Sequence, residues 1–559
     1  MKRLVLIFMV LTTALAGCAS LPTSGEPELI ARPASLDGGV VLDPQGPTPG
    51  SSPENLVTDF LRASGAGLSG DFSVARQFLT KEAAARWNPS AELRVYEDTQ
   101  TPSISQTRNG AIRVSARAAG TLDGGGRYSV ATPEAIINVE FSLVKNEDGE
   151  WRIATLDDGL VIPNSIFSSL YSETLLYFLT ADRAALVPEV RWYLNSGQAT
   201  YAINGLLEGP STWLAIGAHS AIPPETTLTS RGVSVNDGVA RVDFSSDVAS
   251  MRSTDLIAFE AQVSKTLMNV PGVQSVVLTS EGAEMSIPSK VDLSAYPYAT
   301  YTLAALRDGV PAQVSGGEVT QIDPELVDGL GLTSIAPAYS DPLTVAAALG
   351  NDGASIYAVS YVGNPTAELL KGSQLVEPSI DAHDWVWSGE RVSQGEVLAV
   401  HLETGERATF QLPWLGGLTV RDIAVSREGA RMVILTEQSG DVQMNAVSIA
   451  RDATGTPIEI GDPVRFGQSL VEVTDVSWVS EVRLAAIARN PGSSTSSIHI
   501  VGLGTSSVSL AAVDGLVSLS SGRGIDSIVI ENSQHTLFSY DGAGWRLVSD
   551  SLTSPAYPG

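Results

Sequence analysis

The feature that most constrains the fold is a pattern that recurs along residues 295–559. Residues 348–359 align with residues 424–435, and each copy consists of a strand, a polar turn and a second strand. Related Trp-containing segments lie at residues 385–387 and 476–479. Successive copies are roughly 40 residues apart where no insertion intervenes, which is the period of a four-stranded propeller blade. The segment therefore predicts an all-β propeller of about six blades. A pair of β-sandwiches with chance similarity is the alternative.

The N-terminus combines positive charge, an apolar run and the only cysteine of the chain. Lys2 and Arg3 precede an apolar stretch at residues 4–16, which is too short for a comfortable membrane span but typical of an export signal. The Leu-Ala-Gly-Cys sequence at 15–18 resembles the bacterial lipobox. That resemblance implies cleavage before Cys18 and attachment of a diacylglycerol to its thiol. A chance cysteine behind an ordinary signal peptide or a short membrane helix is the alternative.

A single cysteine in an exported chain cannot form an internal disulfide, so the thiol of Cys18 needs another role. Lipid attachment would hold the protein at the membrane, since each buried lipid CH₂ contributes about 0.8 kcal/mol. Residues 1–17 would then be removed as a signal peptide. Residues 18–52 are rich in Pro and Gly and poor in apolar side chains, so they cannot offset the entropy of ordering. We expect a tether there, and about 35 flexible residues span roughly 30 Å.

The charge balance is strongly acidic and limits the classes of partner. The chain has 62 Asp and Glu residues against 34 Lys and Arg residues, and removal of the signal peptide takes away Lys2 and Arg3 but no acidic residue. Such a surface repels nucleic acid, and the sequence contains no basic stretch with interleaved aromatic residues. It also disfavours electrostatic adhesion to anionic lipid, which leaves the acyl group as the expected membrane contact.

Residues 53–165 have the pattern of a small α+β domain. Apolar residues at helical spacing follow Pro53, and a second helical pattern follows Asp71 and continues to Trp87. The period then changes to two, and turn residues such as the glycines at 124–126 separate the predicted strands. Two helices followed by a meander resemble the cone-shaped nuclear-transport-factor-like fold, through the order of the elements rather than through a motif.

Residues 166–290 form a second α+β segment with more specific phrases. These are Leu-Leu-Glu-Gly-Pro at 206–210, Ala-Ile-Pro at 221–223, Ala-Arg-Val-Asp-Phe at 240–244 after an Asp-Gly turn, and Pro-Gly-Val at 271–273. Together they resemble the GerMN domain, which is named for spore-germination lipoproteins. The resemblance implies a compact sheet with helices on one face, a place in the cell envelope and no catalytic set.

Local signals place three elements within this second segment. Asn195 followed by Gln198 is typical of a capping box, so a helix is expected to begin at Asn195. The Asn-Asp-Gly sequence at 236–238 lies between two alternating runs, which predicts a β-hairpin. An amphipathic helix is expected over residues 253–269.

The sequence offers no recognisable catalytic or metal-binding set, and it lacks the HExxH, P-loop and nucleophile-elbow motifs. Ser142 and Lys145 spell an S-x-x-K motif, but they lie in a predicted strand and not one helical turn apart. Asp243 and Asp247 are expected to be solvated loop acids. The histidines, expected at the surface or in turns, are His219, His383, His401, His499 and His535. We therefore predict a non-enzymatic protein without a metal or other cofactor.

The tryptophans of the predicted propeller are the remaining candidates for a binding surface. They are Trp385, Trp387, Trp414 and Trp478. We expect them to pack in the core between blades, because large aromatic side chains contribute most when they are buried. An exposed cluster that binds a ligand is the alternative.

Taken together, the patterns predict a multidomain protein with two α+β domains followed by an all-β propeller. Three such domains behind a lipobox, in this order, resemble the LpqB family of actinobacterial lipoproteins. The resemblance implies a lipid-anchored protein at the extracytoplasmic face of the cell membrane. It also implies contact with the extracytoplasmic domain of the sensor histidine kinase MtrB of the Mtr two-component system, and thereby an influence on cell-wall homeostasis, growth and division. The only site residue that the family contributes is the acylated Cys18.

Two other functions stay open at the level of the sequence. The first is an envelope lipoprotein whose propeller binds a glycan or a lipid. The second is a wall hydrolase, and the lack of a nucleophile or metal set argues against it.

Overall fold

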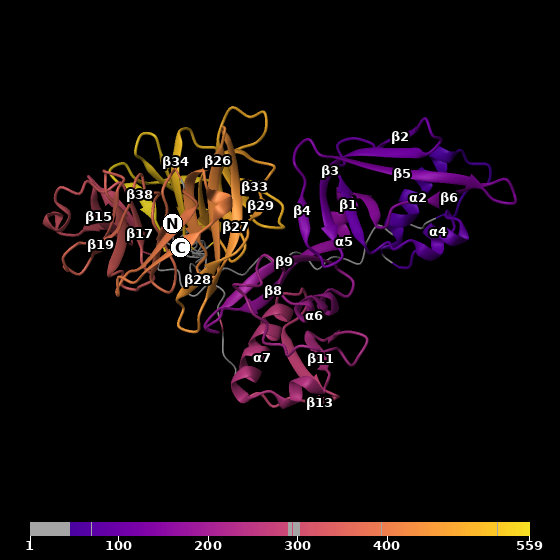
Figure 1. Ribbon diagram of the computed structural model, residues 1–559, viewed down its shortest axis with the longest axis horizontal. Coiled ribbons are helices and arrows are strands. Elements are labelled where there is room, and N and C mark those ends of the chain that lie inside the picture. Colours follow the sequence, from indigo (N-terminus) through magenta and orange to yellow (C-terminus); the bar gives the residue numbers. More distant parts are fainter. Residues whose placement is uncertain are drawn as a thin grey trace, which may run out of the picture. The chain divides into compact units, whose positions relative to one another are not determined.

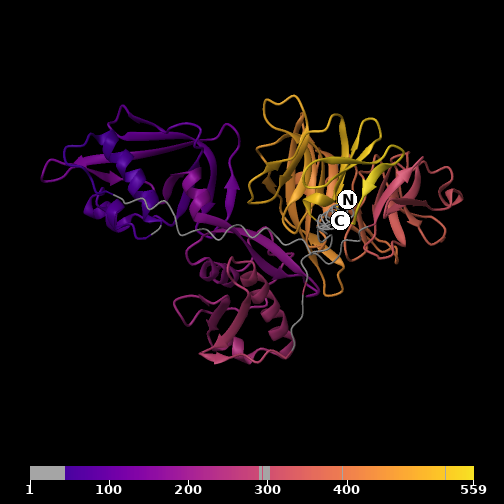
Figure 2. The same ribbon diagram turned by 180° about the vertical axis from the view of Figure 1, so that it is seen from behind.

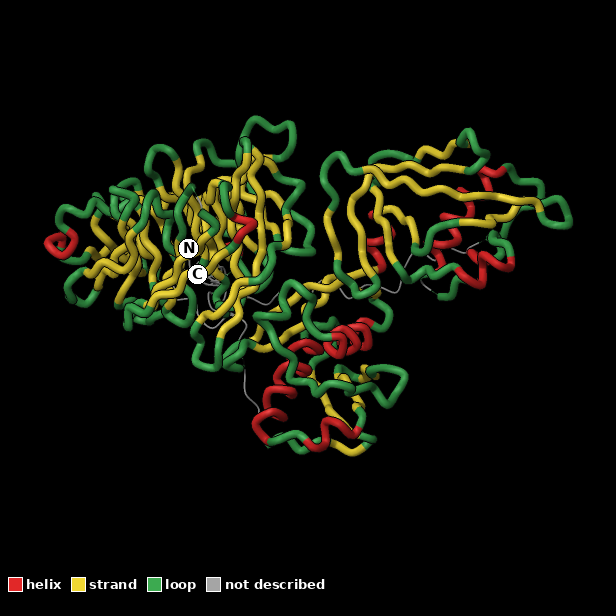
Figure 3. Tube along the Cα trace, in the orientation of Figure 1, coloured by secondary structure: helices red, strands yellow, loops and turns green. Residues whose placement is uncertain are grey.

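The structure, a computed structural model, describes residues 45–68, 70–288, 293, 302–392, 394–522 and 524–558 (Figures 1 and 2). Cys18 lies outside these ranges, so the signal peptide, the lipid attachment and most of the tether stay predictions. Along the described chain, mixed helix and strand gives way to strands interrupted only by short 3₁₀ turns, as the tube in Figure 3 shows.

The first helix begins where the sequence supplies both a cap and a proline. The Ser52 hydroxyl accepts a hydrogen bond from the Asn55 amide (3.3 Å), and a proline occupies the first turn of α2 (Pro53–Gly67). Its buried face, which includes Leu56 and Phe60, packs into the core of the first domain.

The helical pattern after Asp71 forms two short helices, α3 (Ser73–Arg76) and α4 (Lys81–Arg86), rather than one. Between them the chain pairs with the sheet, and the Ile153 amide donates to the Phe78 carbonyl (2.9 Å). A tertiary backbone contact thus interrupts a helix that local periodicity alone predicts to continue.

A sheet of seven strands completes the first domain and shares its core with α2. They are β1 (Glu92–Tyr96), β2 (Ser103–Gln106), β3 (Ile112–Asp123), β4 (Tyr128–Val130), β5 (Ile136–Lys145), β6 (Trp151–Thr155) and β7 (Leu160–Pro163). Their order is β6-β5-β3-β1-β7, and β2 and β4 also pair with β3. Exposed and buried residues alternate along most of β5, as expected of a strand with one face on a core.

The second domain joins a long hairpin to a small sheet with two main helices. Helix α5 (Asn164–Leu170) leads into the antiparallel strands β8 (Tyr171–Leu179) and β9 (Leu186–Leu194). The other elements are α6 (Gln198–Glu208), β10 (Ser234–Asn236), β11 (Val239–Phe244), η1 (Ser246–Ser250), α7 (Ser253–Met268), β12 (Ser275–Ser280) and β13 (Ala283–Glu284). Strands β10 to β13 form a sheet in chain order, and side chains from both helices share its core.

One of the local signals in this domain is confirmed and another is wrong. Asp237 and Gly238 make a two-residue turn with φ values of 49° and 78°, which confirms the predicted hairpin of β10 and β11. The capping box predicted at Asn195 is wrong. Helix α6 begins after Gly197, which adopts the left-handed conformation, and the Asn195 side chain accepts a hydrogen bond from the Ser172 hydroxyl instead (2.7 Å).

The described residues from 303 to 556 form six sheets whose strands mostly follow chain order. The first comprises β14 (Leu303–Arg307), β15 (Val310–Ser315), β16 (Glu318–Gln321) and β38 (Thr553–Ala556). The second comprises β17 (Ser334–Pro337), β18 (Val345–Leu349), β19 (Ser355–Ser360) and β20 (Ala367–Lys371), and the third β21 (Ser379–Ile380), β22 (Trp385–Ser388), β23 (Glu396–His401) and β24 (Arg407–Gln411).

The fourth sheet has an additional strand and the last two have four each. The fourth contains β25 (Thr419–Val425), β26 (Arg431–Gln438), β27 (Asp441–Arg451), β28 (Pro457–Ile460) and β29 (Val464–Phe466). The fifth contains β30 (Val471–Trp478), β31 (Leu484–Arg489), β32 (Ser497–Val501) and β33 (Val508–Ser509), and the sixth β34 (Leu516–Ser521), β35 (Ile528–Asn532), β36 (Leu537–Tyr540) and β37 (Trp545–Ser549).

The C-terminal strand closes the ring. Strand β38 pairs with β14, the first strand of the propeller, and Figure 1 shows it beside the earliest propeller strands. Closure in this way satisfies the sheet edge that β14 would otherwise present to solvent.

Polar side chains on the innermost strands link successive blades. The Asp475 carboxylate in β30 accepts a hydrogen bond from the Leu519 amide in β34 (2.6 Å), and the Ser520 hydroxyl in β34 accepts one from the Tyr557 amide just after β38 (2.9 Å). Burial, together with the neighbouring carboxylate of Asp422, raises the pKa of Asp475 well above its ordinary value. The blades are therefore joined by directional bonds as well as by apolar packing.

The tryptophans of the propeller support the expected core. Trp385, Trp387 and Trp478 are almost fully buried in clusters between neighbouring blades, whereas Trp414 is only partly buried. The predicted fold class, two α+β domains followed by an all-β propeller, is confirmed.

Candidate functional site

The motifs that suggested chemistry do not assemble into a catalytic site in the described ranges. Ser142 and Lys145 lie in strand β5, where they cannot take up the spacing of one helical turn. Among the described residues, no group of three or more His, Cys, Asp or Glu side chains is arranged to hold a metal ion. No helix in the same ranges combines the length and the apolar character needed to cross a membrane.

Asp243 lies in strand β11 rather than in a loop, and hydrogen bonds hold its partly exposed carboxylate in place. Its carboxylate accepts hydrogen bonds from the hydroxyls of Thr229 and Thr279, the latter at 2.6 Å, and from the Gly282 amide (2.8 Å). These bonds hold the pKa of Asp243 below its ordinary value. The expectation of a solvated loop acid is confirmed for Asp247, which is exposed in the turn after β11, and is wrong for Asp243 in its placement in a loop.

The histidines are dispersed along the chain, and His499 is fully buried in β32. Its Nε2 and Nδ1 atoms lie 3.0 Å from the hydroxyls of Ser497 and Ser509, respectively. Burial lowers the pKa of His499, which favours the neutral ring. The expectation that it lies at the surface or in a turn is wrong, because two serines satisfy both ring nitrogens inside the sheet.

Residues far apart in the sequence meet where the three domains touch, and this junction is the candidate functional site. Trp192 in β9 contacts both neighbouring domains. Its amide donates to the Gly126 carbonyl of the first domain (2.7 Å), and its indole Nε1 donates to the Gly504 carbonyl of the propeller (2.7 Å). One residue of the second domain thus fixes the positions of two turns that belong to the others.

Aromatic rings join the first and second domains at the same place. The Phe167 ring lies 5.0 Å from the Tyr128 ring, 4.9 Å from the Trp192 ring and 5.2 Å from the Tyr171 ring, measured between centroids. Burial raises the pKa of both tyrosines to about 12. Contacts of this kind contribute about 0.5–1.5 kcal/mol per pair beyond the area that they bury.

Polar side chains join the β8–β9 hairpin to the propeller. The Tyr177 hydroxyl donates to Glu481 Oε2 (2.6 Å), and Arg483 forms an ion pair with Glu173 (2.6 Å). Burial and the adjacent Glu481 carboxylate raise the pKa of Tyr177, so its hydroxyl stays a donor.

A histidine–carboxylate pair marks the tip of the hairpin. Nε2 of His383, in the third blade, lies 2.9 Å from Oδ2 of Asp182. Burial acts to raise the pKa of Asp182. Hydrogen bonds from His383 and Thr180 outweigh this effect and bring the pKa below its ordinary range. The pair is a specific contact between the second domain and the propeller.

Arg431 in β26 makes several bonds at the contact between the propeller and the hairpin, and one of them reaches the hairpin itself. Its guanidinium forms a buried ion pair with Glu428 (2.6 Å) and donates to the carbonyls of Pro188 (3.3 Å) and Glu481 (2.7 Å). The same group lies over the ring of Trp478, 4.9 Å from its centroid. Four different neighbours therefore depend on one side chain.

The backbone approaches closely at this contact. A Cβ at position 217 would lie 2.8 Å from the Ile449 carbonyl oxygen and 2.9 Å from that of Ala430, so only glycine fits there. Beside it, the Ser448 hydroxyl donates to the Trp213 carbonyl (2.6 Å). Such contacts allow little relative movement of the second domain and the fourth blade.

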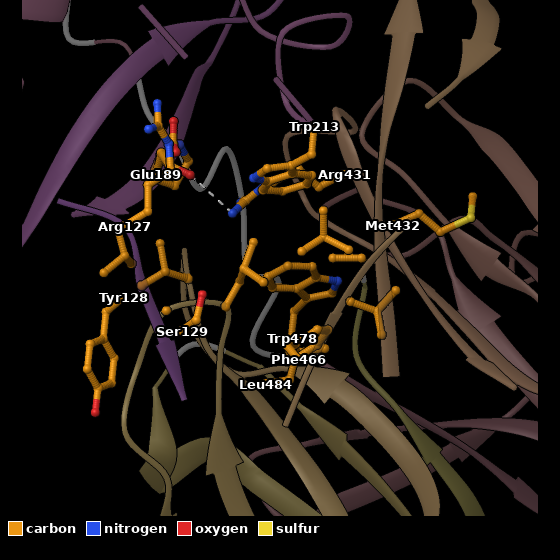
Figure 4. A pocket seen from close by; sticks show the side chains of 18 residues that line it. Arg127, Tyr128, Ser129, Glu189, Trp213, Arg431, Met432, Phe466, Trp478 and Leu484 are labelled. Atoms are coloured by element: carbon orange, nitrogen blue, oxygen red, sulfur yellow. Dashed lines mark hydrogen bonds between the residues drawn. The ribbon is translucent and has the colours of Figure 1, made fainter. Parts of the chain in front are cut away.

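A cavity of about 160 Å³ lies at the junction (Figure 4). All three domains contribute to its wall, and the labelled side chains are Arg127, Tyr128, Ser129, Glu189, Trp213, Arg431, Met432, Phe466, Trp478 and Leu484. The dashed line in Figure 4 marks the hydrogen bond that Arg431 donates to the Pro188 carbonyl. The volume is below the range of about 300–1,000 Å³ that is usual for small-molecule sites. The geometry of this cavity therefore suits a domain contact better than a ligand site.

Sequence reasoning did not identify the residues of this junction. Tyr177 and Glu481 are 304 positions apart, and Trp192 and Gly504 are 312 apart, so no local pattern connects them. The available signal was the composition of the hairpin strands, which carry apolar and aromatic residues on both faces. A strand that exposes one face to water is expected to alternate instead.

Comparison with protein families gives three matches along the described chain. Residues 46–168 match the family described as "Lipoprotein LpqB, N-terminal domain", residues 175–286 match "Sporulation and spore germination", and residues 309–558 match "Lipoprotein LpqB beta-propeller domain". The first GerMN domain of the sporulation protein GerM from Bacillus subtilis also resembles part of the chain. It is 20% identical and covers 21% of this chain and 90% of that one, but the TM-score of 0.18 is too low to support an argument.

Curated relatives match over nearly the whole length. A protein of Thermobifida fusca named Lipoprotein LpqB is 26% identical over 98% of this chain and 97% of its own length. Relatives of the same name from Cutibacterium acnes (26% identity, 97% of each chain) and Nocardia farcinica (27% identity, 85% and 83%) agree with it. The two LpqB-specific domain matches and these long alignments show that the chain belongs to the LpqB lipoprotein family.

Proposed function

We propose that this lipoprotein is anchored through Cys18 to the extracytoplasmic face of the cell membrane and acts as a non-enzymatic accessory to a sensor histidine kinase of the MtrB type. It contacts the extracytoplasmic domain of the kinase directly and so modulates signalling in cell-wall homeostasis, growth and division. The observation that carries the proposal is the near full-length similarity to LpqB lipoproteins. The kinase as partner comes from the family resemblance.

Three features of the chain support an accessory role. The described chain forms one compact unit in which Trp192 and Arg431 tie the domains together, so a partner meets a preformed surface. The formal net charge of −28 favours a basic patch on the partner. A tether of about 35 residues reaches roughly 30 Å, which suits a sensor domain just outside the bilayer.

Replacing the anchor residue is the first test. We expect Cys18→Ala to release the protein from the membrane fraction while the folded domains stay intact, because the chain has no second cysteine to acylate. Fractionation and intact-mass measurement report the result, and Ser20→Ala serves as a matched control two residues away. A variant with wild-type mass that still partitions fully with membranes would show that the lipobox interpretation is wrong.

Direct binding to the kinase is the second test. Full-length protein in detergent should bind the purified extracytoplasmic domain of the kinase saturably at micromolar concentrations. Association should slow as salt rises, because an acidic surface steers a basic partner over longer distances at low ionic strength. Absence of saturable binding at low salt would remove the direct-contact proposal. Hydrolysis of peptidoglycan fragments by the same preparation would overturn its non-enzymatic part.

A further inference from the structure

A second, larger cavity of about 350 Å³ lies between the first and second domains. One wall comes from the end of α2 and from the first-domain sheet, including Glu92 and Asp123, and the other comes from second-domain residues that include Tyr171, Tyr193 and Tyr201. Its volume falls within the range of about 300–1,000 Å³ that is typical of small-molecule sites. We propose that this cavity binds a neutral, hydroxyl-rich ligand the size of a disaccharide.

The aromatic wall is suited to the flat face of a sugar ring. The rings of Tyr193 and Tyr201 lie 5.7 Å apart with their planes only 17° from parallel, and Tyr201 keeps 40% of its surface exposed. The face of an aromatic ring carries partial negative charge. The C–H groups on one face of a pyranose carry partial positive charge, so the two surfaces attract each other as they exclude water.

Two glycines from different domains make room for this wall. A Cβ at Gly126, which has a φ of 82°, would lie 2.7 Å from Cε1 of Tyr193. A Cβ at Gly205 in α6 would clash with the Tyr193 hydroxyl. The backbones at Gly126 and Gly205 therefore lie in close contact with the Tyr193 ring and hold it in place. The Tyr193 ring in turn supports the ring of Tyr201.

The polar groups of the cavity carry compensated charge. Glu92 pairs with Arg94 (2.7 Å), and Asp123 pairs with Arg127 (3.3 Å). Because each carboxylate is matched by a guanidinium, the wall offers hydrogen-bond acceptors without a strong local field. A carboxylate has about four acceptor positions, so an ion pair leaves some for the hydroxyl groups of a ligand.

This pattern distinguishes among ligand classes. A phosphate or other anion would need a cation that is not already paired, and the arginines next to the cavity are engaged with Glu92 and Asp123. A quaternary amine would gain from uncompensated carboxylates, and here both are compensated. Leu93, Leu122 and Leu160 add an apolar part to the lining, which suits the methyl of an N-acetyl group.

The test uses full-length protein in a polyoxyethylene ether detergent, because detergents with sugar headgroups would compete. The probe is N,N′-diacetylchitobiose, titrated into the millimolar range with saturation-transfer NMR and tryptophan fluorescence as readouts. We expect saturable binding, transfer to the ring protons of the sugar and a change in the tryptophan emission of the protein. Choline and glucose 6-phosphate serve as the cationic and anionic comparison ligands.

Three variants locate the binding. Tyr201→Ala should weaken chitobiose binding about tenfold, which corresponds to about 1.4 kcal/mol. Tyr540→Ala removes a partly buried tyrosine that lies 5.1 Å from the Trp545 ring in the sixth blade, and it should leave the affinity unchanged. Glu92→Gln keeps the shape of the wall but removes a charged acceptor, and a loss of several-fold is expected.

Three results would overturn the proposal. They are no saturable chitobiose binding in the millimolar range, equal affinity of wild type and Tyr201→Ala, and binding of choline or glucose 6-phosphate in place of chitobiose. This site is independent of the proposed kinase contact. Kinase binding is measured without sugar and sugar binding without kinase, so failure of one proposal is distinguishable from failure of the other.

Discussion

A chain that ends at Asp550 should lose the cooperative unfolding of its propeller. Deleting residues 551–559 removes β38 and therefore leaves β14 as an open edge. It also removes the fully buried Leu552 side chain. We expect the free energy of unfolding of the propeller to fall by more than about 4 kcal/mol, which exceeds the range of about 0.5–3 kcal/mol that is typical of single substitutions.

Specific bonds of the C-terminal segment explain the size of this effect. The Tyr557 amide donates to the Ser520 hydroxyl (2.9 Å), and the Pro558 carbonyl accepts from Arg427 Nε (3.1 Å). Arg427 is buried in the turn between β25 and β26, and burial lowers its pKa to about 9. Without Pro558, this buried cation loses one of the carbonyls that compensate for its desolvation.

Denaturant unfolding followed by tryptophan fluorescence checks the prediction, because Trp385, Trp387 and Trp478 report on the propeller core. A chain that lacks only Gly559 is the matched control and should unfold like wild type, since it keeps β38 and Pro558. A chain ending at Asp550 that keeps the wild-type midpoint and slope would show that ring closure contributes little to stability.

Patterns with a short period predicted much of the fold. The turn at Asp237 and Gly238 needs two residues that accept positive φ, and that requirement is visible in the sequence. The blades repeat one local unit, so their strands and the buried Trp385 and Trp387 were also accessible to sequence reasoning. In these cases the physical cause lies within a few residues of its effect.

Features with a distant cause were not predictable in this way. The helix expected to start at Asn195 begins later, because Ser172, on the neighbouring strand, donates to the side chain that was to form the cap. His499 is buried because Ser509 on the adjacent strand bonds one of its ring nitrogens. The lining of the sugar-sized cavity likewise depends on Gly126 and Tyr193, which belong to different domains.

The junction offers the second large expected effect, at Arg431. Arg431→Met leaves the Glu428 carboxylate buried without its cation, and it breaks the bonds to the carbonyls of Pro188 and Glu481. Removing one partner of a buried ion pair costs about 3–5 kcal/mol, because the remaining charge stays desolvated. Methionine occupies a similar volume and can still pack against the ring of Trp478.

Two further variants separate the buried charge from the loss of packing. Arg421→Met breaks a pair with Glu437 whose arginine is about half exposed, and it should cost no more than about 1 kcal/mol. The double variant Glu428→Gln with Arg431→Met removes both buried charges, so it should recover part of the stability lost in Arg431→Met alone.

Amide hydrogen exchange locates the effect of Arg431→Met. If Arg431 fastens the second domain to the propeller, exchange should speed up in β8 and β9 as well as in β26, since the bond from Arg431 to the Pro188 carbonyl joins the two domains. Faster exchange confined to the fourth blade would show that Arg431 stabilises only the propeller. The three domains would then hold together through Trp192 and the Tyr177–Glu481 bond. If the unfolding free energy of Arg431→Met equals that of wild type, Arg431 does not stabilise the propeller either.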